Sequence, residues 1–554
     1  MEEFIFGTVA IDDLKLVHHN VSHSGVQHAH EIEPRDPVPG EPVRITVHTS
    51  PDTCVDQVVC YYTTDGSIPQ GAHGKSSVTT VLPLEKVGSH WDTFQWGYST
   101  VWQAVLPGRP EGTMVRYRIG AWCGEGLEIF ADYPDVKATT DRSAGDFFHG
   151  RPLNVQYVGN PAEGKIFAYH YDRYLPPLWA REAAIYHIFV DRFFPGSGRE
   201  WLQTENLHDF FGGTLWGVAE KLDYIKDLGA TTVWLSPIFP SETTHGYDAY
   251  DYEHVSERMG GEEALRTLVT EAHQRGMRVI LDLVCNHISD NHPIFQDAYR
   301  TPHSPYRDWF FFDDPNTEYR TFFGVRSMPQ VNLASEGARE WMFDIARFWL
   351  REFDVDGFRL DHANGPGPEF WPDFWRTCKQ EKADSFIVGE VVEPAPVLER
   401  YIGRMDGTLD FLFADMLRRT FGYQTVSRTE FHQFLEAHLN YFPRDFLLPT
   451  FIDNHDMDRF LFIANNDKEI LKQTVALQMK LPGPPVIYYG TEVGMSQTVS
   501  KTSKIGLEAS RAAMVWDKSQ DRELLSFYRE QLQQRAAARP WEGPLPDLKN
   551  LGEV

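Results

Sequence analysis

Short apolar runs that end in polar or charged residues recur over residues 184–490 of this chain. Two of them close on the carboxylates Asp361 and Glu390, and the runs 279–284 and 449–454 also lead into polar residues. Such runs are typical of strands buried on both faces of a parallel sheet, in which the carboxyl ends of neighbouring strands meet at one edge. This recurrence constrains the fold more than any other feature of the sequence.

The strands can be counted, and the segments between them favour helices. Apolar residues recur at three- to four-residue spacing over 262–272 and 339–352, as in amphipathic helices. An alternation of buried strands and amphipathic helices predicts an α/β fold, a (β/α)8 TIM barrel with its polar strand ends at one mouth. The eight candidate strands are 184–190, 231–236, 279–284, 356–361, 386–390, 408–413, 449–454 and 485–490.

Asp361 and Glu390 would then face the same opening. Hydrolysis of a glycosidic bond needs two carboxyl groups, one that protonates the leaving oxygen and one that meets the anomeric carbon from the opposite side. Either acid alone is more often a cap or a salt-bridge partner. The hypothesis of glycoside hydrolysis therefore depends on the pair and on the polar ends of the other strands.

Four motifs in a fixed order resemble the α-amylase family of glycoside hydrolases. Similar pieces follow the second and eighth strands and lie beyond the eighth, so the resemblance covers about residues 175–538. It implies a retaining mechanism through a covalent glycosyl intermediate. The motifs are 282–287, 357–361, 389–390 and 453–456, and the further pieces are 245–248, 488–492 and 511–516.

The resemblance implies a role for each acidic residue. Asp361 would be the nucleophile, and Glu390 the general acid that then becomes the base for the attacking water. Asp456 would bind the sugar hydroxyls beside the reacting carbon and help to keep the pKa of Glu390 raised. Arg359 lies two residues before Asp361 on one strand, so both side chains would face the barrel interior and the guanidinium would hold Asp361 ionised.

The resemblance also implies a binding site for the sugar that is cleaved. His287 and His455 would donate hydrogen bonds to its hydroxyls, and Tyr247 would stack under its ring. His245 is a further candidate for this subsite. A histidine near a strand end is usually structural and a lone tyrosine is usually core, so these predictions depend on the motifs.

Asp282 and Asn286 are treated separately. In the family, the Asp is mainly structural and the Asn is often a calcium ligand, whereas an amide that fixes a loop is the alternative for Asn286. Calcium takes six to eight oxygen ligands, and the sequence supplies one clear candidate. We predict no metal site and no required cofactor, which leaves Ca²⁺ only as an optional structural ion.

Residues 287–332 are too many for an ordinary loop after the third strand. The resemblance implies a small inserted domain here, whose aromatic side chains either line sugar subsites or, as burial statistics favour, form its core. Residues 328–332 are similar to the motif of the neopullulanase and cyclomaltodextrinase branch, but 362–365 depart from that branch. These positions border the acceptor side of the cleft, so substrate preference is left open.

Residues 1–150 have a different character, with strand-like runs separated by Pro and Gly turns. This predicts an N-terminal β-sandwich that resembles the immunoglobulin-like domains of the same branch and serves carbohydrate binding or dimerisation. Trp91, Trp96 and Trp102 are either a sugar platform or sandwich core. A linker is predicted over 151–178, the catalytic barrel over 179–540 and a tail over 541–554, without the β domain that usually follows or with that domain cut off.

Composition agrees with this organisation. A formal charge of −27 makes nucleic acid and anionic membranes poor partners, and it suits a neutral polymer. No window approaches the length of a membrane span, the first residues lack a signal-peptide pattern, and the five cysteines are few and scattered. The sequence therefore favours a cytoplasmic protein, with Cys285 as a packed thiol.

The predicted function is hydrolysis of α-1,4-glucosidic bonds in maltodextrins, cyclodextrins or related α-glucans of the starch type. An α-glucanotransferase, in which a sugar hydroxyl resolves the intermediate, stays open because the motifs do not decide the acceptor. A sucrose- or trehalose-converting enzyme also stays open because of the departures at 362–365. A glucan-binding protein without activity would require the loss of an acid, and Asp361, Glu390 and Asp456 are all present.

Overall fold

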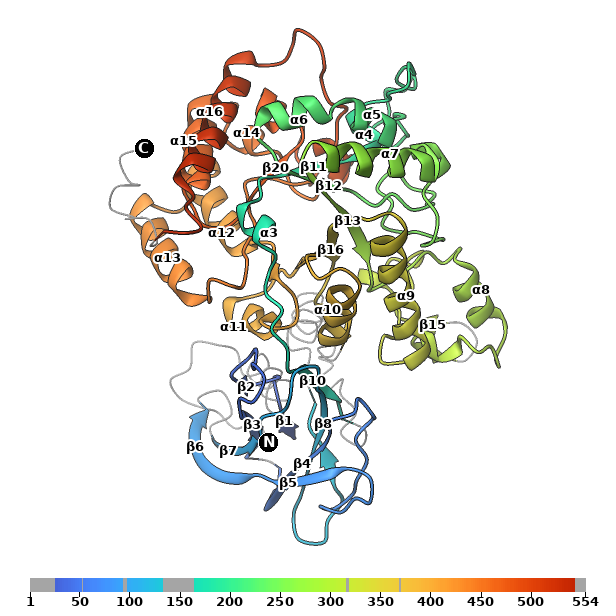
Figure 1. Ribbon diagram of the computed structural model, residues 1–554, viewed down its shortest axis with the longest axis vertical. Coiled ribbons are helices and arrows are strands. Elements are labelled where there is room, and N and C mark those ends of the chain that lie inside the picture. The colour runs from blue at the N-terminus through green and yellow to red at the C-terminus, as the bar shows by residue number, and fades with distance from the viewer. Residues whose placement is uncertain are drawn as a thin grey trace, which may run out of the picture. The chain divides into compact units, whose positions relative to one another are not determined.

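The computed structural model describes residues 25–51, 53–92, 97–132, 164–314, 318–367 and 370–543. The chain divides into two compact units, Met1–Arg173 and Tyr174–Val554, which Figure 1 shows in blue and in green to red. None of the helices in the described ranges has the length and apolar character that a membrane crossing needs.

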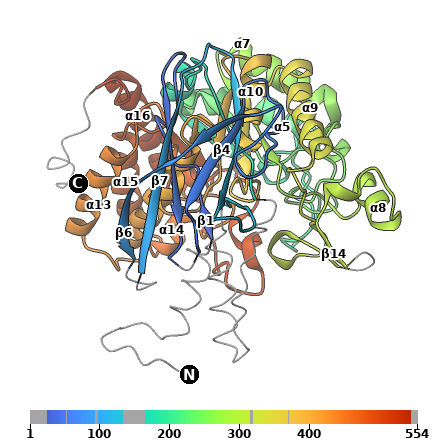
Figure 2. The ribbon, with the colours of Figure 1, turned by 90° about the horizontal axis from the view of Figure 1, so that it is seen from below.

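The described residues of the N-terminal unit form two antiparallel sheets with five strands each. Figure 2 shows strands of this unit in blue. The strand order of the first sheet is β1-β3-β7-β6, with β2 also paired to β3, and that of the second is β10-β8-β4-β5, with β9 paired to β8. The strands are β1 (Val26–Gln27), β2 (Ile32–Glu33), β3 (Val43–Thr49), β4 (Gln57–Thr63), β5 (Thr80–Pro83), β6 (Glu85–Asp92), β7 (Gly97–Leu106), β8 (Met114–Trp122), β9 (Ile129–Phe130) and β10 (Phe167–His170).

The two sheets share one apolar core. Val43, Ile45 and Val47 alternate along β3 and are fully buried, and they belong to the same cluster as Tyr117 and Ile119 of the other sheet. A period of two along each strand places one face of each sheet against the other, which is the arrangement of a sandwich. The strand-like runs between Pro and Gly turns therefore predicted strands such as β3, β4, β7 and β8 correctly.

The three tryptophans named in the sequence analysis do not share one environment. Trp102 lies in the core, where its indole nitrogen donates to Oγ1 of Thr49 at 3.1 Å. Trp91 is 48% exposed, so the core interpretation is wrong for it, because β6 is an edge strand and its side chains are exposed. Trp96 lies outside the described residues.

The linker predicted over 151–178 is wrong in its second half. Residues 167–170 form β10, which pairs with β8 and is buried throughout, and a short helix, α3 (Leu178–Glu182), follows. The four-residue run was too short to recognise as a strand without its partner. Residues 133–163 lie outside the described part.

The cysteines also differ from the prediction. Cys54 and Cys123 form a disulfide within the N-terminal unit, a pair that the scattered spacing did not reveal. Cys285 is a buried free thiol, as predicted. Disulfides are rare in reducing compartments, so this pair argues against the cytoplasmic prediction.

The second unit contains eight parallel strands, in the order β18-β17-β16-β13-β12-β11-β20-β19. A single parallel bridge between Gly407 and Leu447 links the two ends of this order. The eight-stranded parallel sheet that the sequence predicted is confirmed. Its strands are β11 (Ile185–Ile188), β12 (Thr232–Leu235), β13 (Arg278–Val284), β16 (Gly357–Asp361), β17 (Phe386–Gly389), β18 (Gly407–Thr408), β19 (Thr450–Phe451) and β20 (Pro485–Tyr488).

The strand predicted over 408–413 is mostly wrong. It ends at Thr408, and helix α12 (Phe411–Leu417) begins soon after. Asp410 caps this helix, because its carboxylate accepts the backbone N–H of Phe413 at 3.0 Å. The apolar residues at 411–413 therefore continue a helix instead of a strand.

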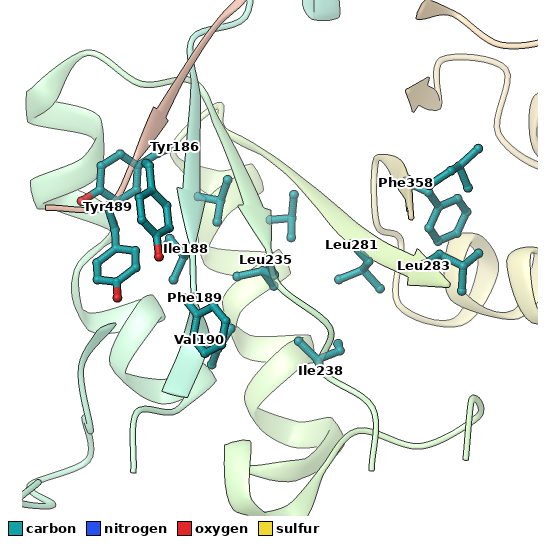
Figure 3. Packing of buried hydrophobic residues seen from close by; sticks show 14 of the residues in the cluster. Tyr186, Ile188, Phe189, Val190, Leu235, Ile238, Leu281, Leu283, Phe358 and Tyr489 are labelled. Atoms are coloured by element: carbon teal, nitrogen blue, oxygen red, sulfur yellow. The ribbon is translucent and has the colours of Figure 1, made fainter. Parts of the chain in front are cut away.

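Helices lie between the strands along the chain and around the sheet (Figure 1). Helix α7 (Gly261–Gln274) contacts β13, α9 (Glu336–Glu352) packs beside α10 (Phe370–Glu381), and α15 (Lys468–Met479) packs beside α16 (Arg522–Ala538). Leu281 and Leu283 point from β13 into this helical layer, together with Ile188 of β11 and Leu235 of β12 (Figure 3).

The residues between these outward positions form a second cluster. It contains Ile185, Trp234, Ile280, Phe386 and Val388 from four strands. Because side chains alternate along a strand, these residues and their neighbours two positions on share the inner face of the sheet. The predicted site residues Arg359, Asp361 and Glu390, and the structural Asp282, occupy positions on this inner face.

The segment predicted as an inserted domain contains helix α8 (Pro293–Arg300) and a hairpin of β14 (Phe312–Asp314) and β15 (Glu318–Tyr319). Phe295 and Phe310 are buried and pack edge to face, with ring centroids 4.9 Å apart, and they belong to the same apolar core as barrel residues such as Leu283. Phe323 is 80% exposed and does not belong to that core.

Candidate active site

A guanidinium at the centre of the inner face joins three carboxyl groups. Nη1 of Arg359 donates to Oδ1 of Asp282 at 2.7 Å and to Oδ1 of Asp361 at 2.8 Å. Nη2 lies 2.8 Å from Oε2 of Glu390, but it is not aligned for a hydrogen bond. The structure therefore brings the predicted Arg359, Asp361 and Glu390 together from two neighbouring strand ends.

Burial disfavours ionisation of both acids. It raises the pKa of Asp361 to about 7, against the opposing charge of Arg359. It also raises the pKa of Glu390 to about 7, again against Arg359. The charged form of each acid accepts one aligned hydrogen bond, from the Arg359 guanidinium for Asp361 and from the backbone N–H of His362 for Glu390. Because the donor to Asp361 carries a full positive charge, its bond favours ionisation more than a neutral backbone donor does, and Asp361 is therefore the better carboxylate of the two.

The backbone also holds Glu390 in place. The N–H of His362 donates to Oε2 of Glu390 at 3.1 Å, and the N–H of Glu390 donates to the carbonyl of Leu360 at 2.8 Å. His362 adopts a positive φ of 43°, a conformation that is unusual for a non-glycine residue. The residue after Asp361 thus turns its N–H towards the partner acid.

Asp456 is the third predicted acid, and it is the most open of the three. Its side chain is 37% exposed, compared with 9% for Asp361 and 14% for Glu390. Oδ1 accepts from Nη2 of Arg511 at 2.8 Å, and Oδ2 lies 3.0 Å from Nε2 of His455. Both carboxylate oxygens therefore have a fixed direction.

Tyr247 and His455 join Asp456 to Asp282. The Tyr247 hydroxyl donates to Oδ2 of Asp282 at 3.1 Å and contacts Nε2 of His455. Since that hydroxyl has one proton, His455 would donate from Nε2, and burial holds the pKa of its ring well below the usual value. The rings of Tyr247 and His455 are stacked 5.4 Å apart.

The two remaining predicted histidines lie beside this group. His287 is fully buried, burial lowers its pKa to about 3, and its Nε2 has no hydrogen-bond partner among the described residues. A buried, neutral ring with an unused nitrogen suits a hydroxyl group of a ligand. His245 accepts the backbone N–H of Tyr247 on Nδ1 at 3.1 Å, and it therefore fixes Tyr247.

Two residues of the site were missed by the sequence reasoning. His187 on β11 is stacked on Trp234 at 3.6 Å and lies edge-on to His455 at 5.0 Å. The sequence could have revealed His187 by its position on the first strand, where it alternates with outward-facing residues and so faces the interior. Arg511 stood inside the motif piece 511–516 but received no role, because its partner Asp456 is 55 residues away in the sequence.

Asn286 supports the loop-fixing alternative. Its side-chain oxygen accepts from Nε2 of Gln330 at 3.4 Å, and its backbone carbonyl accepts from the N–H of Val331 at 2.9 Å. Its side chain therefore ties β13 to the inserted segment. Within the described residues, no group of three or more His, Cys, Asp or Glu is placed to hold a metal ion.

Comparison with known proteins identifies the second unit. A family model described as "Alpha amylase, catalytic domain" matches residues 187–527. Alpha-amylase 2 of Dictyoglomus thermophilum is 40% identical over 362 residues, which are 65% of this chain and 64% of that protein. The intracellular maltogenic amylase of Bacillus subtilis is 34% identical over 378 residues, 65% of this chain and 63% of that protein.

A cyclomaltodextrinase of Geobacillus thermopakistaniensis is 33% identical over 382 residues, 66% of this chain and 64% of that protein. The matches thus span slightly less than two thirds of these relatives. A solved structure of a cyclomaltodextrinase is similar over 93% of this chain and 84% of that chain, with a TM-score of 0.62 and 26% identity.

Proposed function

Because this chain belongs to the alpha-amylase family through its catalytic domain, we propose that it is a retaining glycoside hydrolase of α-1,4-glucans. Maltodextrins and cyclodextrins are the proposed substrates, in line with the names of its maltogenic amylase and cyclomaltodextrinase relatives. The observation that carries the proposal is the contact of one buried guanidinium, Arg359, with both Asp361 and Glu390.

The geometry supports a double displacement. Asp361 attacks the anomeric carbon and forms an ester with it, while Glu390 gives its proton to the leaving glycosidic oxygen. Glu390, now a carboxylate, takes a proton from water, whose oxygen attacks the same carbon and releases Asp361. Two inversions give net retention. Asp456, with its exposed carboxylate, binds sugar hydroxyls next to the reacting carbon, as do His287 and His455.

The test uses the purified chain with maltoheptaose, β-cyclodextrin, pullulan and sucrose. We expect maltooligosaccharides that appear first as α-anomers in proton NMR, and no turnover by Asp361→Asn. Asp356→Asn is the matched control, because Asp356 is a buried carboxylate that lies directly before the start of β16. It is five residues before Asp361, about 16 Å away at about 3.3 Å per residue. Products that appear first as β-anomers, or no turnover by the unmodified chain, would refute the proposal.

One observation favours transfer to a sugar acceptor as a second activity. A strip of rings begins at His287 and leads outward, with centroids 4.4 Å apart between His287 and Phe322, and 5.0 Å between Phe322 and His362. It ends at the exposed Phe323, 5.3 Å from His362. His362 also holds Glu390, so the strip lies on the side of the leaving group. Maltoheptaose products longer than the substrate would support transfer.

The proposal extends to the rest of the chain. The bridge between Gly407 and Leu447 supports a closed (β/α)8 barrel. The shared core of the two N-terminal sheets supports an immunoglobulin-like domain, which binds carbohydrate or forms a homodimer. The hairpin of β14 and β15 and the packing of Phe295 on Phe310 support an inserted domain. The relative named intracellular supports a cytoplasmic location, against the disulfide. The contacts of Asn286 support activity without calcium.

A further inference from the structure

Five charges of alternating sign form a row that begins at Asp456. Nη2 of Arg511 donates to Oδ1 of Asp456 at 2.8 Å, and Nη1 donates to Oε1 of Glu508 at 2.8 Å. Nη2 of Arg192 donates to the other oxygen of Glu508 at 3.3 Å, and its Nε donates to Oδ2 of Asp191 at 2.8 Å. The row therefore connects the candidate active site with the segment after β11.

Burial shows that only one end of this row is open. The side chains of Asp191, Arg192, Glu508 and Arg511 are at most 8% exposed, whereas that of Asp456 is 37% exposed. Burying charges costs several kcal/mol per ion unless each has partners with good geometry. The only accessible carboxylate of the row is that of Asp456, which faces the candidate active site. The four buried charges therefore hold this carboxylate in a position where it can bind a substrate.

The contacts of Arg511 explain how the row can orient Asp456. A guanidinium is planar, and its donors keep fixed directions relative to one another. Nε of Arg511 donates to the carbonyl of His455 at 2.8 Å, and Nη1 is held by Glu508. With these two donors fixed, the direction of Nη2 is set, so it meets Oδ1 of Asp456 and leaves Oδ2 beside His455.

Arg192 fixes the second carboxylate oxygen of Glu508, to which its Nη2 donates. It is fully buried, and its Nη1 donates to the carbonyl of Arg511 at 2.9 Å. Its backbone carbonyl accepts the N–H of Met514 at 2.7 Å. The segment that carries Glu508 and Arg511 is therefore tied to the end of the first strand at three points.

We propose that Glu508 is a positioning residue, which fixes the guanidinium of Arg511 and through it the Asp456 carboxylate that binds the substrate. This inference depends on the proposed function. Without the charge of Glu508, Arg511 is free to turn both terminal nitrogens towards Asp456 and draw its oxygens away from the sugar. Arg511 also keeps a full positive charge next to the site.

That additional positive charge has a predictable effect on pH dependence. Asp456 helps to raise the pKa of Glu390, after burial and Asp361. Without Glu508, the positive charge of Arg511 is no longer balanced, and it would cancel part of the effect of the Asp456 charge on Glu390. The pKa of Glu390 would then fall, so this acid would lose its proton, and the enzyme its activity, at a lower pH. The charged and titratable groups that face Glu390 or Asp456 are Arg359, Asp282, Asp361, His187, His245, Tyr247, His455, Lys501 and Arg511.

The experiment compares the unmodified chain with Glu508→Gln, which keeps the shape of the side chain and removes its charge. We expect kcat on maltoheptaose to fall about tenfold to a hundredfold, the loss that a misplacement of about 1 Å produces. The alkaline limb of kcat/KM should move to lower pH. Asp356→Asn, which removes a buried charge away from the site, should change neither kcat nor this limb.

A double variant separates positioning from a structural role. In Asp456→Asn, Glu508→Gln should cause little further loss of kcat, because the residue through which it acts is already altered. If Glu508→Gln does not fold, as judged by its thermal unfolding, Arg511→Lys replaces it in the same comparisons, since a lysine cannot hold Glu508, Asp456 and the His455 carbonyl in one plane.

Two results would overturn the inference. One is an unchanged kcat and pH profile in Glu508→Gln while Asp456→Asn is impaired. The other is a loss of the same factor in both backgrounds, which would mean that Glu508 acts independently of Asp456. Absence of glucan turnover by the unmodified chain is a different result, and it would refute the proposed function itself.

Discussion

Replacement of Arg359 by methionine removes the charge shared by Asp282, Asp361 and Glu390 and keeps an apolar stem in its place. The bond from Nη1 to Asp361 is short, aligned and buried, at 2.8 Å. A hydrogen bond to a charged group contributes about 1.5–3 kcal/mol. At about 1.4 kcal/mol per pH unit, its loss raises the pKa of Asp361 by about 1–2 units.

The sign of the effect on activity follows from the two roles. Asp361 must be ionised to attack, and its pKa is already raised to about 7, so in Arg359→Met only about a tenth to a hundredth of the molecules would carry this carboxylate at pH 7. The acid limb of kcat/KM therefore moves up by about 1–2 pH units. Arg359 also lowers the pKa of Glu390, so the alkaline limb moves in the same direction.

The assay is the pH dependence of kcat/KM on maltoheptaose, with thermal unfolding to confirm that the variant is folded. Arg359→Lys retains the charge but lacks the planar fork, so its limbs should shift less than those of Arg359→Met. An acid limb of Arg359→Met at the same pH as in the unmodified chain would refute the reasoning, because it would mean that Arg359 does not control ionisation of Asp361.

Three further perturbations have defined outcomes. Tyr247→Phe deletes the hydroxyl between Asp282 and His455, and urea unfolding should show a loss of about 1–3 kcal/mol because a buried partner is left unsatisfied. Phe323→Ala should lower kcat/KM for maltoheptaose about two- to tenfold, the value of a ring contact of about 0.5–1.5 kcal/mol, and leave turnover of α-maltosyl fluoride unchanged. Asp356→Asn should lower stability at neutral pH, because bonds from His273 and the charge of Lys382 outweigh burial and hold the pKa of Asp356 below its usual value.

Each of these has a control. The control for Phe323→Ala is Tyr423→Ala, which removes another exposed ring and should leave the kinetics on maltoheptaose unchanged. If Phe323→Ala lost as much kcat/KM on α-maltosyl fluoride as on maltoheptaose, a role of Phe323 in binding the leaving group would be contradicted. Stability of Tyr247→Phe equal to that of the unmodified chain would contradict the hydroxyl contacts. The stability difference of Asp356→Asn should be full above the unfolded pKa of about 3.9 and vanish as pH falls through the lowered folded pKa; a difference independent of pH would contradict the pairing.

The sequence predicted those parts of the molecule that depend on local pattern. Strand alternation placed Arg359 and Asp361 on one face, and both contact each other there. The same alternation on the first strand would have placed His187 inside, but a lone histidine in an apolar run carried no chemical meaning without the stacked Trp234.

Other features depend on partners that are distant in the chain. Glu508 contacts Arg192, 316 residues away, and no local pattern reveals such a pair. The strand predicted at 408–413 was wrong because capping by Asp410 decides between two structures that suit the same apolar residues. Strand β10 was missed because four buried residues are recognised as a strand only beside β8.

Trapping of the glycosyl intermediate tests the central claim most directly. A 5-fluoro α-glucosyl fluoride reacts with the nucleophile of a retaining α-glucosidase-type site, and the resulting ester hydrolyses slowly enough for mass spectrometry of the intact protein and its peptides. The double displacement predicts one added glycosyl group, on the peptide that contains Asp361, and none in Asp361→Asn. An adduct on Glu390, or turnover of maltoheptaose with retention and an adduct that persists in Asp361→Asn, would contradict the assignment of the two carboxyl groups.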